Sequence, residues 1–181
     1  FPGWGVGGIL SPQHLHPSAW AVVDLVGDEL LLVEGSTAAV AGWLAERSTT
    51  LTTLTLTRDG GFPSVVVRAA ISPHRAIATM LNTGGRHTEF SSGAVPGLGL
   101  AGAASVRLGG GVSGADVLGA EVGEAALLVG GQEVRVPSLA LRASMHDPQG
   151  LVGMNVLRGT VVAVSADMSR PVLWQVPASG R

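Results

Sequence analysis

The sequence predicts an all-β fold, and composition, strand patterning and turn signals each point to it. Of the 181 residues, 27 are Gly and only 4% are aromatic, while Val, Leu and Thr recur throughout. This combination suits short strands joined by tight turns better than a helical bundle. Segments with strand character follow one another at short intervals and are separated by Gly-rich turns. These features predict a compact sandwich or barrel.

The N-terminal part, residues 1–48, is predicted to be an extension or cap that contains one helix. Residues 1–18 are rich in Gly, Pro and His and indicate irregular chain. Residues 19–33 predict two short strands around a Gly-Asp turn. Ser36 is a candidate N-cap for a helix. The apolar residues of that helix recur at helical spacing: Val40, Trp43 and Leu44.

The remainder, residues 49–181, is predicted to be one β domain. Residues 50–57 alternate Thr and Leu imperfectly, as a half-buried strand does. The turn signal Arg58-Asp59-Gly60-Gly61 follows, so residues 50–70 are predicted to form a β-hairpin. A short final helix is expected to begin near Asn155. Further strands are expected at residues 76–81, 103–108, 116–121, 125–129, 133–142 and 160–165.

Charge and composition disfavour several classes of function. All eleven basic residues are Arg and scattered, and the net charge is −2, so nucleic-acid binding is not expected. The absence of Cys excludes disulfides and thiol nucleophiles. No apolar run is long enough for a membrane span. Because the chain starts at Phe1 without Met, we expect a processed product or a trimmed piece, and we lean toward an exported or cell-envelope domain.

Three stretches carry the pattern of a functional site. The predicted strand 76–81 runs into Asn82-Thr83-Gly84-Gly85, and a polar turn follows. Farther along comes Leu108-Gly109-Gly110-Gly111-Val112-Ser113-Gly114, flanked by strand patterns. The third stretch is Gly150-Leu151-Val152-Gly153-Met154-Asn155-Val156-Leu157.

In order and spacing these stretches resemble the retropepsin-like family, the single-lobe aspartic proteases of bacterial type. That family has Asp-Thr-Gly-Ala or Asp-Thr-Gly-Ser after apolar residues, then a glycine-tipped flap, then hydrophobic residues and Gly before a short helix. The first stretch matches with Asn82 in place of Asp and Gly85 in place of Ala. Residues 107–114 match the flap, and residues 150–157 match the third motif. The resemblance covers residues 63–165.

The resemblance implies a closed acid-protease barrel with a short C-terminal helix, working as a homodimer. Each chain supplies one motif, so a two-fold axis passes through the site. Two facing carboxylates share a proton there, because like charges so close cannot both ionise. The ionised group is the general base for a bound water, and the protonated group hydrogen-bonds the scissile carbonyl. The implied activity is that of an aspartic endopeptidase.

The resemblance also gives roles to individual residues. Asn82 stands at the catalytic position, Thr83 braces the loop across the axis, and Gly84 permits a tight turn. The flap closes over an extended protein or peptide substrate, which binds as an added strand. No metal or organic cofactor is implied, and the substrate includes the chain itself, in cis, as a precursor. The expected substrate contacts are Gly85, Leu108, Gly109, Gly110, Gly111, Val112, Leu151 and Val152.

Asn82 predicts that the chain as it stands is inactive. An amide has nearly the shape of a carboxylate, but it carries no charge and takes no proton near neutral pH. Two explanations stay open: a deliberate Asp→Asn substitution, which we favour because the surrounding loop still fits a working site, and a natural non-catalytic relative. The second makes the chain a peptide-binding or dimerisation module on the same fold. A plain β-domain, such as a carbohydrate-binding or envelope module, is a third alternative.

The same residues also admit simpler interpretations. Asn82-Thr83-Gly84-Gly85 alone is also typical of an ordinary turn, because Asn and Gly tolerate positive φ. The triple glycine at residues 109–111 lacks the Lys-Ser or Lys-Thr of a phosphate loop. The five His are dispersed, so no metal site is expected, and Asn155 is interpreted as a helix N-cap. No Gly-x-Ser-x-Gly elbow surrounds the candidate nucleophiles Ser91, Ser92 and Ser113.

Overall fold

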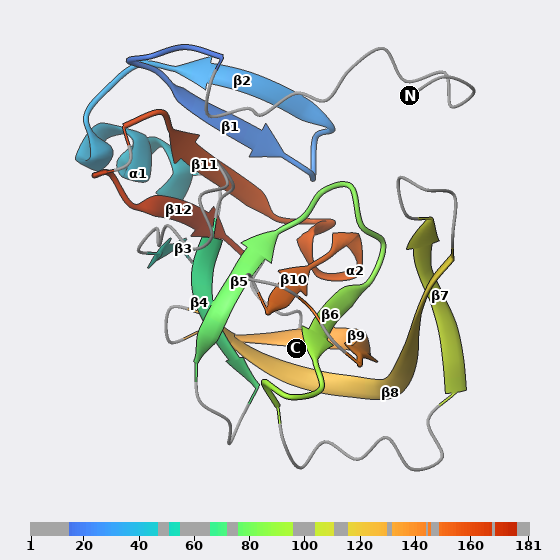
Figure 1. Cartoon of the computed structure of the whole chain (residues 1–181). Coiled ribbons are helices and arrows are strands. Elements are labelled where there is room, and N and C mark those ends of the chain that lie inside the picture. The colour runs from blue at the N-terminus through green and yellow to red at the C-terminus, as the bar shows by residue number, and fades with distance from the viewer. Residues whose placement is uncertain are drawn as a thin grey trace.

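The computed structural model describes residues 15–46, 51–54, 66–71, 76–95, 104–110, 116–129, 132–143, 145, 149–167 and 169–176. In these ranges it holds twelve strands and two short helices, which confirms the all-β prediction (Figure 1). The strands form two sheets.

The smaller sheet joins the N-terminal strands to the C-terminal ones. All of its neighbouring strands are antiparallel. The N-terminal segment therefore shares a sheet with the end of the chain, and the division at residue 48 stays a prediction. In order across the sheet, the strands are β2 (Glu29–Val33), β1 (Trp20–Asp24), β11 (Val161–Ser165), β12 (Val172–Gln175) and β3 (Leu51–Leu54).

Local signals in this region are confirmed. The turn between β1 and β2 places Asp28 at a φ of 55°, and the Asp24 carboxylate accepts hydrogen bonds from Val26 N at 2.9 Å and Gly27 N at 2.8 Å. The predicted helix is α1 (Thr37–Ala45). Its N-cap is Ser36, whose Oγ accepts a hydrogen bond from Ala39 N at 3.2 Å.

The larger sheet has seven strands. Their order is β4 (Val66–Ile71), β5 (Ile77–Leu81), β10 (Gly150–Val152), β6 (Thr88–Ser91), β9 (Gln132–Arg142), β8 (Asp116–Val129) and β7 (Ala104–Gly110). The expectation of a closed barrel was wrong, because neither sheet closes into one. β4 pairs with β5 and also, at residues 69–71 only, with β8, so the sheet bends back on itself. β7 continues beyond β8 as an edge strand.

Burial on both faces explains why strands of the smaller sheet have nearly continuous hydrophobic sequences. In β11, Val161 and Ala163 pack in the cluster that contains Val40 and Leu44 of α1. Val162 and Val164 pack instead against residues of the larger sheet. β11 is therefore covered on both faces, by α1 and by the larger sheet, and all five of its residues are buried.

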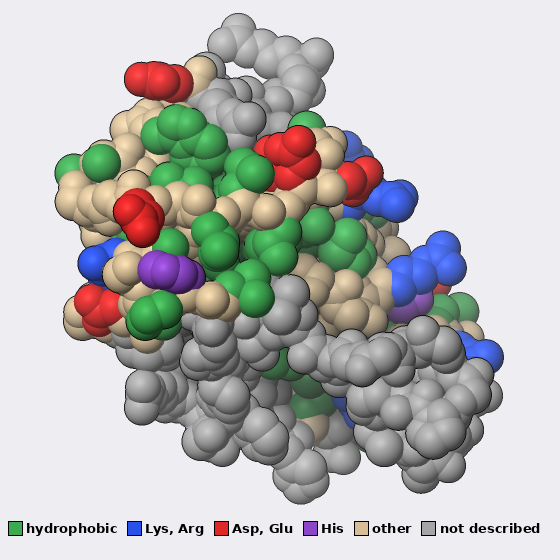
Figure 2. Space-filling model, turned by 90° about the horizontal axis from the view of Figure 1, so that it is seen from above, with side chains coloured by type: hydrophobic (Ala, Val, Ile, Leu, Met, Phe, Trp, Pro, Cys, Tyr) green, Lys and Arg blue, Asp and Glu red, His purple; other side chains and the backbone are tan. Residues whose placement is uncertain are grey.

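The outer strand of this sheet is different. Leu30 and Leu32 of β2 are 43% and 52% exposed. Figure 2 looks onto the molecule from this side and shows hydrophobic side chains on the surface. Among the described helices, none is long and apolar enough to cross a membrane.

Two predictions about strands were wrong. The described strands β3 and β4 do not pair as the hairpin expected at residues 50–70, because β3 pairs with β12 and β4 pairs with β5 and β8, in the other sheet. The strands expected at 116–121 and 125–129 are one strand, β8. Register shifts lie on either side of Gly123, whose φ of 85° is left-handed, so the residue interrupts the ladder without ending the strand.

Candidate functional site

β10 is inserted between two strands that are consecutive in the chain. It runs parallel to β5 and antiparallel to β6, with Leu151 opposite Met80 on one side and Glu89 on the other. Residues 82–87 connect β5 to β6, so this loop must pass over the end of β10 (Figure 1). The insertion brings the first and third sequence motifs together.

Hydrogen bonds hold the loop to the end of β10 and to the segment that follows it. Asn82 N donates to Val152 O at 2.9 Å. In return, Met154 N donates to Gly85 O at 2.8 Å and Asn155 N donates to Arg86 O at 3.0 Å. These bonds satisfy backbone groups at the start of α2 (Met154–Leu157), which has no side-chain cap of its own. The loop position is therefore fixed from both ends.

Gly153 is the closest contact between the two motifs. A Cβ at this position would overlap the carbonyl group of His87 and lie 3.0 Å from Gly85 O. Its backbone N donates to Thr88 Oγ1 at 3.1 Å. The glycine is required here because of the close approach of two backbones.

Asn82 lies at the end of β5 and is half-buried. Its Oδ1 accepts a hydrogen bond from Gly84 N at 3.1 Å, which makes a tight Asx turn. Its Nδ2 lies over Gly85, 2.5 Å from where a Cβ of that residue would be. Thr83 and Gly84 are exposed. A carboxylate at position 82 would accept the same bond from Gly84 N, so the turn suits Asp as well as Asn.

The N-cap interpretation of Asn155 was wrong. The N-cap residue of α2 is Gly153, and Asn155 lies inside the helix. The Asn155 Oδ1 accepts a hydrogen bond from Thr88 Oγ1 at 2.7 Å, and its Nδ2 donates to Ser138 O at 2.6 Å. Its side chain therefore ties α2 to β6 and β9. Sequence reasoning missed Thr88 and Ser138, because nothing local links them to Asn155.

The flap-like stretch belongs to the hairpin of β7 and β8. Gly109 and Gly110 end β7, with a register shift between Arg107 and Gly109. Leu108 is buried, and its side chain lies against Gly119 of β8. Gly111 and Val112 lie outside the described residues.

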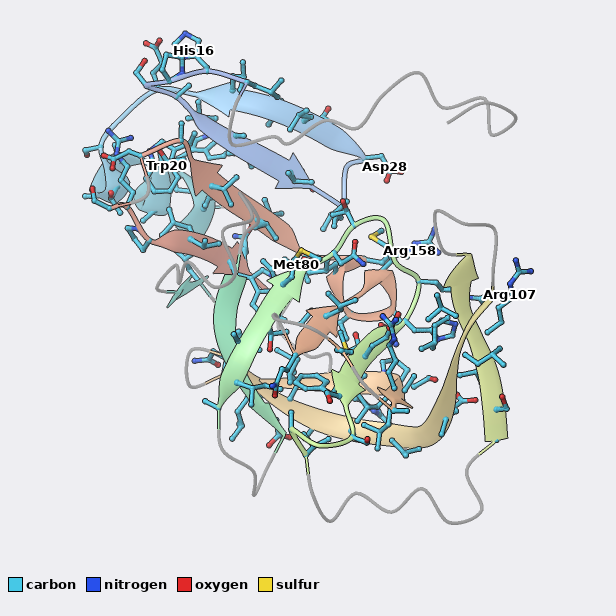
Figure 3. The ribbon with its side chains drawn as sticks, viewed as in Figure 1. His16, Trp20, Asp28, Met80, Arg107 and Arg158 are labelled. Atoms are coloured by element: carbon cyan, nitrogen blue, oxygen red, sulfur yellow. The ribbon has the colours of Figure 1, made fainter. Side chains whose placement is uncertain are left out.

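The two expected substrate contacts in β10 point to opposite faces. Val152 is fully buried in the core shared by the two sheets. Leu151 is half-buried and lies beside Met80. Strand alternation puts Asn82 on the same face as Met80, two residues earlier. Leu151 and Met80 are therefore apolar residues of the sheet face that carries Asn82, and Figure 3 marks the position of Met80.

Glu89 adds a carboxylate to this face. It is 4% exposed, and its Oε2 accepts no hydrogen bond from the described residues, although Arg142 Nη1 lies 3.5 Å away. Burial raises the pKa of Glu89 above its ordinary value, and the nearby Arg142 opposes this only in part. Sequence reasoning did not single out Glu89.

Glu89→Gln is expected to change the pH dependence of stability. Because the folded pKa is raised, the native state holds the proton more tightly than the unfolded chain. Stability should therefore fall as pH rises from the ordinary carboxyl pKa, 4.5, through the raised value. Glu89→Gln should remove this loss and melt at a higher temperature than the parent at neutral pH, in melting curves recorded across pH.

Glu124→Gln is the matched control. Glu124 is exposed, and its hydrogen bond with Arg135 lowers the pKa of its carboxyl. Glu124→Gln should melt at a slightly lower temperature than the parent at neutral pH, and this difference should disappear as pH falls. A Glu89→Gln variant that matches the parent at every pH would contradict the burial argument.

Other chemistries find little support in the described residues. In those ranges no three His, Asp or Glu side chains gather where they could share a metal ion. Ser91 is buried, and the Ser92 hydroxyl donates to Ala143 O at 3.3 Å. Comparison with protein-family models and with curated proteins finds no match to the chain.

Proposed function

We propose that this chain is a retropepsin-like aspartic endopeptidase whose catalytic Asp is replaced by Asn82. The hydrolysed bond is a peptide bond in an extended substrate. The active form is a homodimer, with one loop 82–87 from each subunit at the two-fold axis. No metal or organic cofactor takes part.

One observation carries this proposal. The loop that contains Asn82 and the segment 152–155, far apart in sequence, are joined by the hydrogen bonds of Asn82, Met154 and Asn155. The resemblance requires these two motifs to form one site. An ordinary surface turn after a strand needs neither the inserted β10 nor the glycine contact beneath it.

The chemistry follows from position 82. A carboxylate there keeps the bond from Gly84 N, which leaves its second oxygen for water or for the facing carboxylate. Two such groups share one proton, so one acts as base and the other as hydrogen-bond donor to the substrate carbonyl. With Asn82 in both subunits, neither side chain at this position can remove a proton from water.

Asn82→Asp is expected to create peptidase activity that the parent chain lacks. The two forms differ by one side-chain atom, so the parent is the matched control. Purified proteins should be incubated with a peptide library from about pH 3 to 8, the range over which a carboxylate pair titrates, and the products identified by mass spectrometry. A statine-type inhibitor should block the cleavage.

Mixing the two forms tests the dimeric site. In an equal mixture that exchanges subunits, about a quarter of the dimers carry two Asp. Activity per Asp subunit should therefore fall to about half. The protease proposal is contradicted if the Asp form is monomeric by sedimentation. It is also contradicted if the Asp form cuts nothing in the whole pH range.

Asn82 itself favours a second candidate function, peptide binding without hydrolysis. In that case the unaltered chain binds extended peptides, and Asn82→Asp binds them without cutting. Fluorescence anisotropy with labelled peptides, run beside the cleavage assay, separates the two functions.

A further inference from the structure

An open hollow of about 510 Å³ lies beside the candidate catalytic loop. Arg86 of the loop 82–87 forms one wall. The rest comes from Met154 and Asn155 of α2 and from Arg158, which caps the C-terminus of that helix. The loop and the helix are joined by the bond from Asn155 N to Arg86 O, so the lining residues form one connected unit.

The chemistry of the hollow is cationic over an apolar floor. Arg86 and Arg158 are exposed, and within the described ranges neither makes an ion pair. The Asn155 amide is already engaged by Thr88 and Ser138. The half-buried Met154 packs on the core and supplies the apolar surface.

Other arginines lie on the same side of the molecule. Figure 3 shows Arg158 beside α2 and Arg107 farther along the same side, on β7. In Figure 2 most of the visible Arg side chains lie toward this edge of the molecule, with Asp and Glu side chains among them. None of the residues that line the hollow is acidic. Guanidinium groups bind carboxylates through paired N–H donors, so an anionic group is the complementary ligand.

We propose that this hollow is a subsite for a carboxylate of the peptide substrate, with Arg86 and Arg158 as its specificity-determining residues. The inference rests on the proposed function, because it takes an extended peptide to lie along the loop that holds Asn82. A peptide with Asp or Glu at one position near the cleaved bond then binds and reacts better than its amide analogue. The hollow has room for one such side chain.

The preference is tested in the Asn82→Asp form. Matched peptides carry Glu or Gln at each position in turn, and kcat/KM is compared for each pair. Glu should be favoured by about tenfold at one position, since each exposed charge pair adds only modestly to binding. The double substitution Arg86→Gln and Arg158→Gln should bring this ratio close to one, and raised salt should weaken it in the unsubstituted Asp form.

Arg135→Gln, in the same Asn82→Asp form, is the matched control. Arg135 is also an exposed arginine, but it lies on β9 and is paired with Glu124. Its substitution should leave the Glu-to-Gln ratio as it was. The conservative pair Arg86→Lys and Arg158→Lys should retain part of the preference. Melting curves establish that each variant is folded.

The outcomes separate this inference from the proposed function. Cleavage without a Glu preference, or with one that survives the double Gln substitution, overturns the subsite alone. The double Gln variant could instead change dimer dissociation and leave the Glu-to-Gln ratio as it was. The two arginines would then bind a carboxylate of the partner subunit, and this result also overturns the subsite. Failure of the Asp form to cleave, together with no peptide binding by the unaltered chain, overturns both.

Discussion

Gly153→Ala is expected to destabilise the chain by more than about 3 kcal/mol and to abolish cleavage in the Asn82→Asp form. The added Cβ would overlap the backbone of His87 and approach Gly85 O. The chain cannot move freely on either side of His87, since Gly85 O and Arg86 O accept the hydrogen bonds that begin α2 and Thr88 pairs with Leu139 of β9. Relief of the overlap must therefore separate the loop from β10. Urea denaturation of the purified variant measures the loss.

Gly42→Ala is the control for this prediction. Gly42 lies in α1, and no atom lies within 4 Å of a Cβ added there. Because Ala is the better helix former by about 1 kcal/mol, this variant should be more stable than the parent. The same chemical change thus has opposite effects at the two positions. A Gly153→Ala variant as stable as the parent would show that the two motifs are not in contact.

Local features of the fold were predictable from sequence. Ser36 and the helical spacing that follows it predicted α1, because a cap and apolar residues at helical spacing are encoded within a few residues. The turn at residues 25–28 was predictable for the same reason. The supposed hairpin at 50–70 failed, since a turn signal shows where the chain reverses but not which strand it pairs with.

The site was predictable only in part. Its three motifs could be found in the sequence, but the insertion of β10 between β5 and β6 could not, because three residues are too few to show strand alternation. Asn155 was misinterpreted, since Asn is common at N-caps and its true partners, Thr88 and Ser138, are distant in sequence. The burial of Glu89 could not be predicted from the sequence, because it depends on the pairing of β6 with β9 and β10.

Asn155→Asp is expected to destabilise the protein by about 2 to 4 kcal/mol at neutral pH, because a partly buried carbonyl loses its donor and faces a charge. The new carboxylate would still accept the bond from Thr88 Oγ1, but its other oxygen would face Ser138 O without a proton. Once protonated, it can donate to that carbonyl. Its folded pKa should therefore be raised, and the destabilisation should grow as pH rises above about 4.

Asn155→Ala and Thr88→Val separate the two halves of this network. Asn155→Ala removes both hydrogen bonds without adding an ionisable group, so its loss should not vary with pH relative to the parent. Thr88→Val removes the hydroxyl bonded to Asn155 Oδ1 and to Gly153 N, and should loosen the loop directly. Melting curves at about pH 4 and pH 7, on either side of the expected titration, make the comparison. If Asn155→Asp and Asn155→Ala lose the same stability at both pH values, Ser138 O is not the partner that makes Asn the required residue.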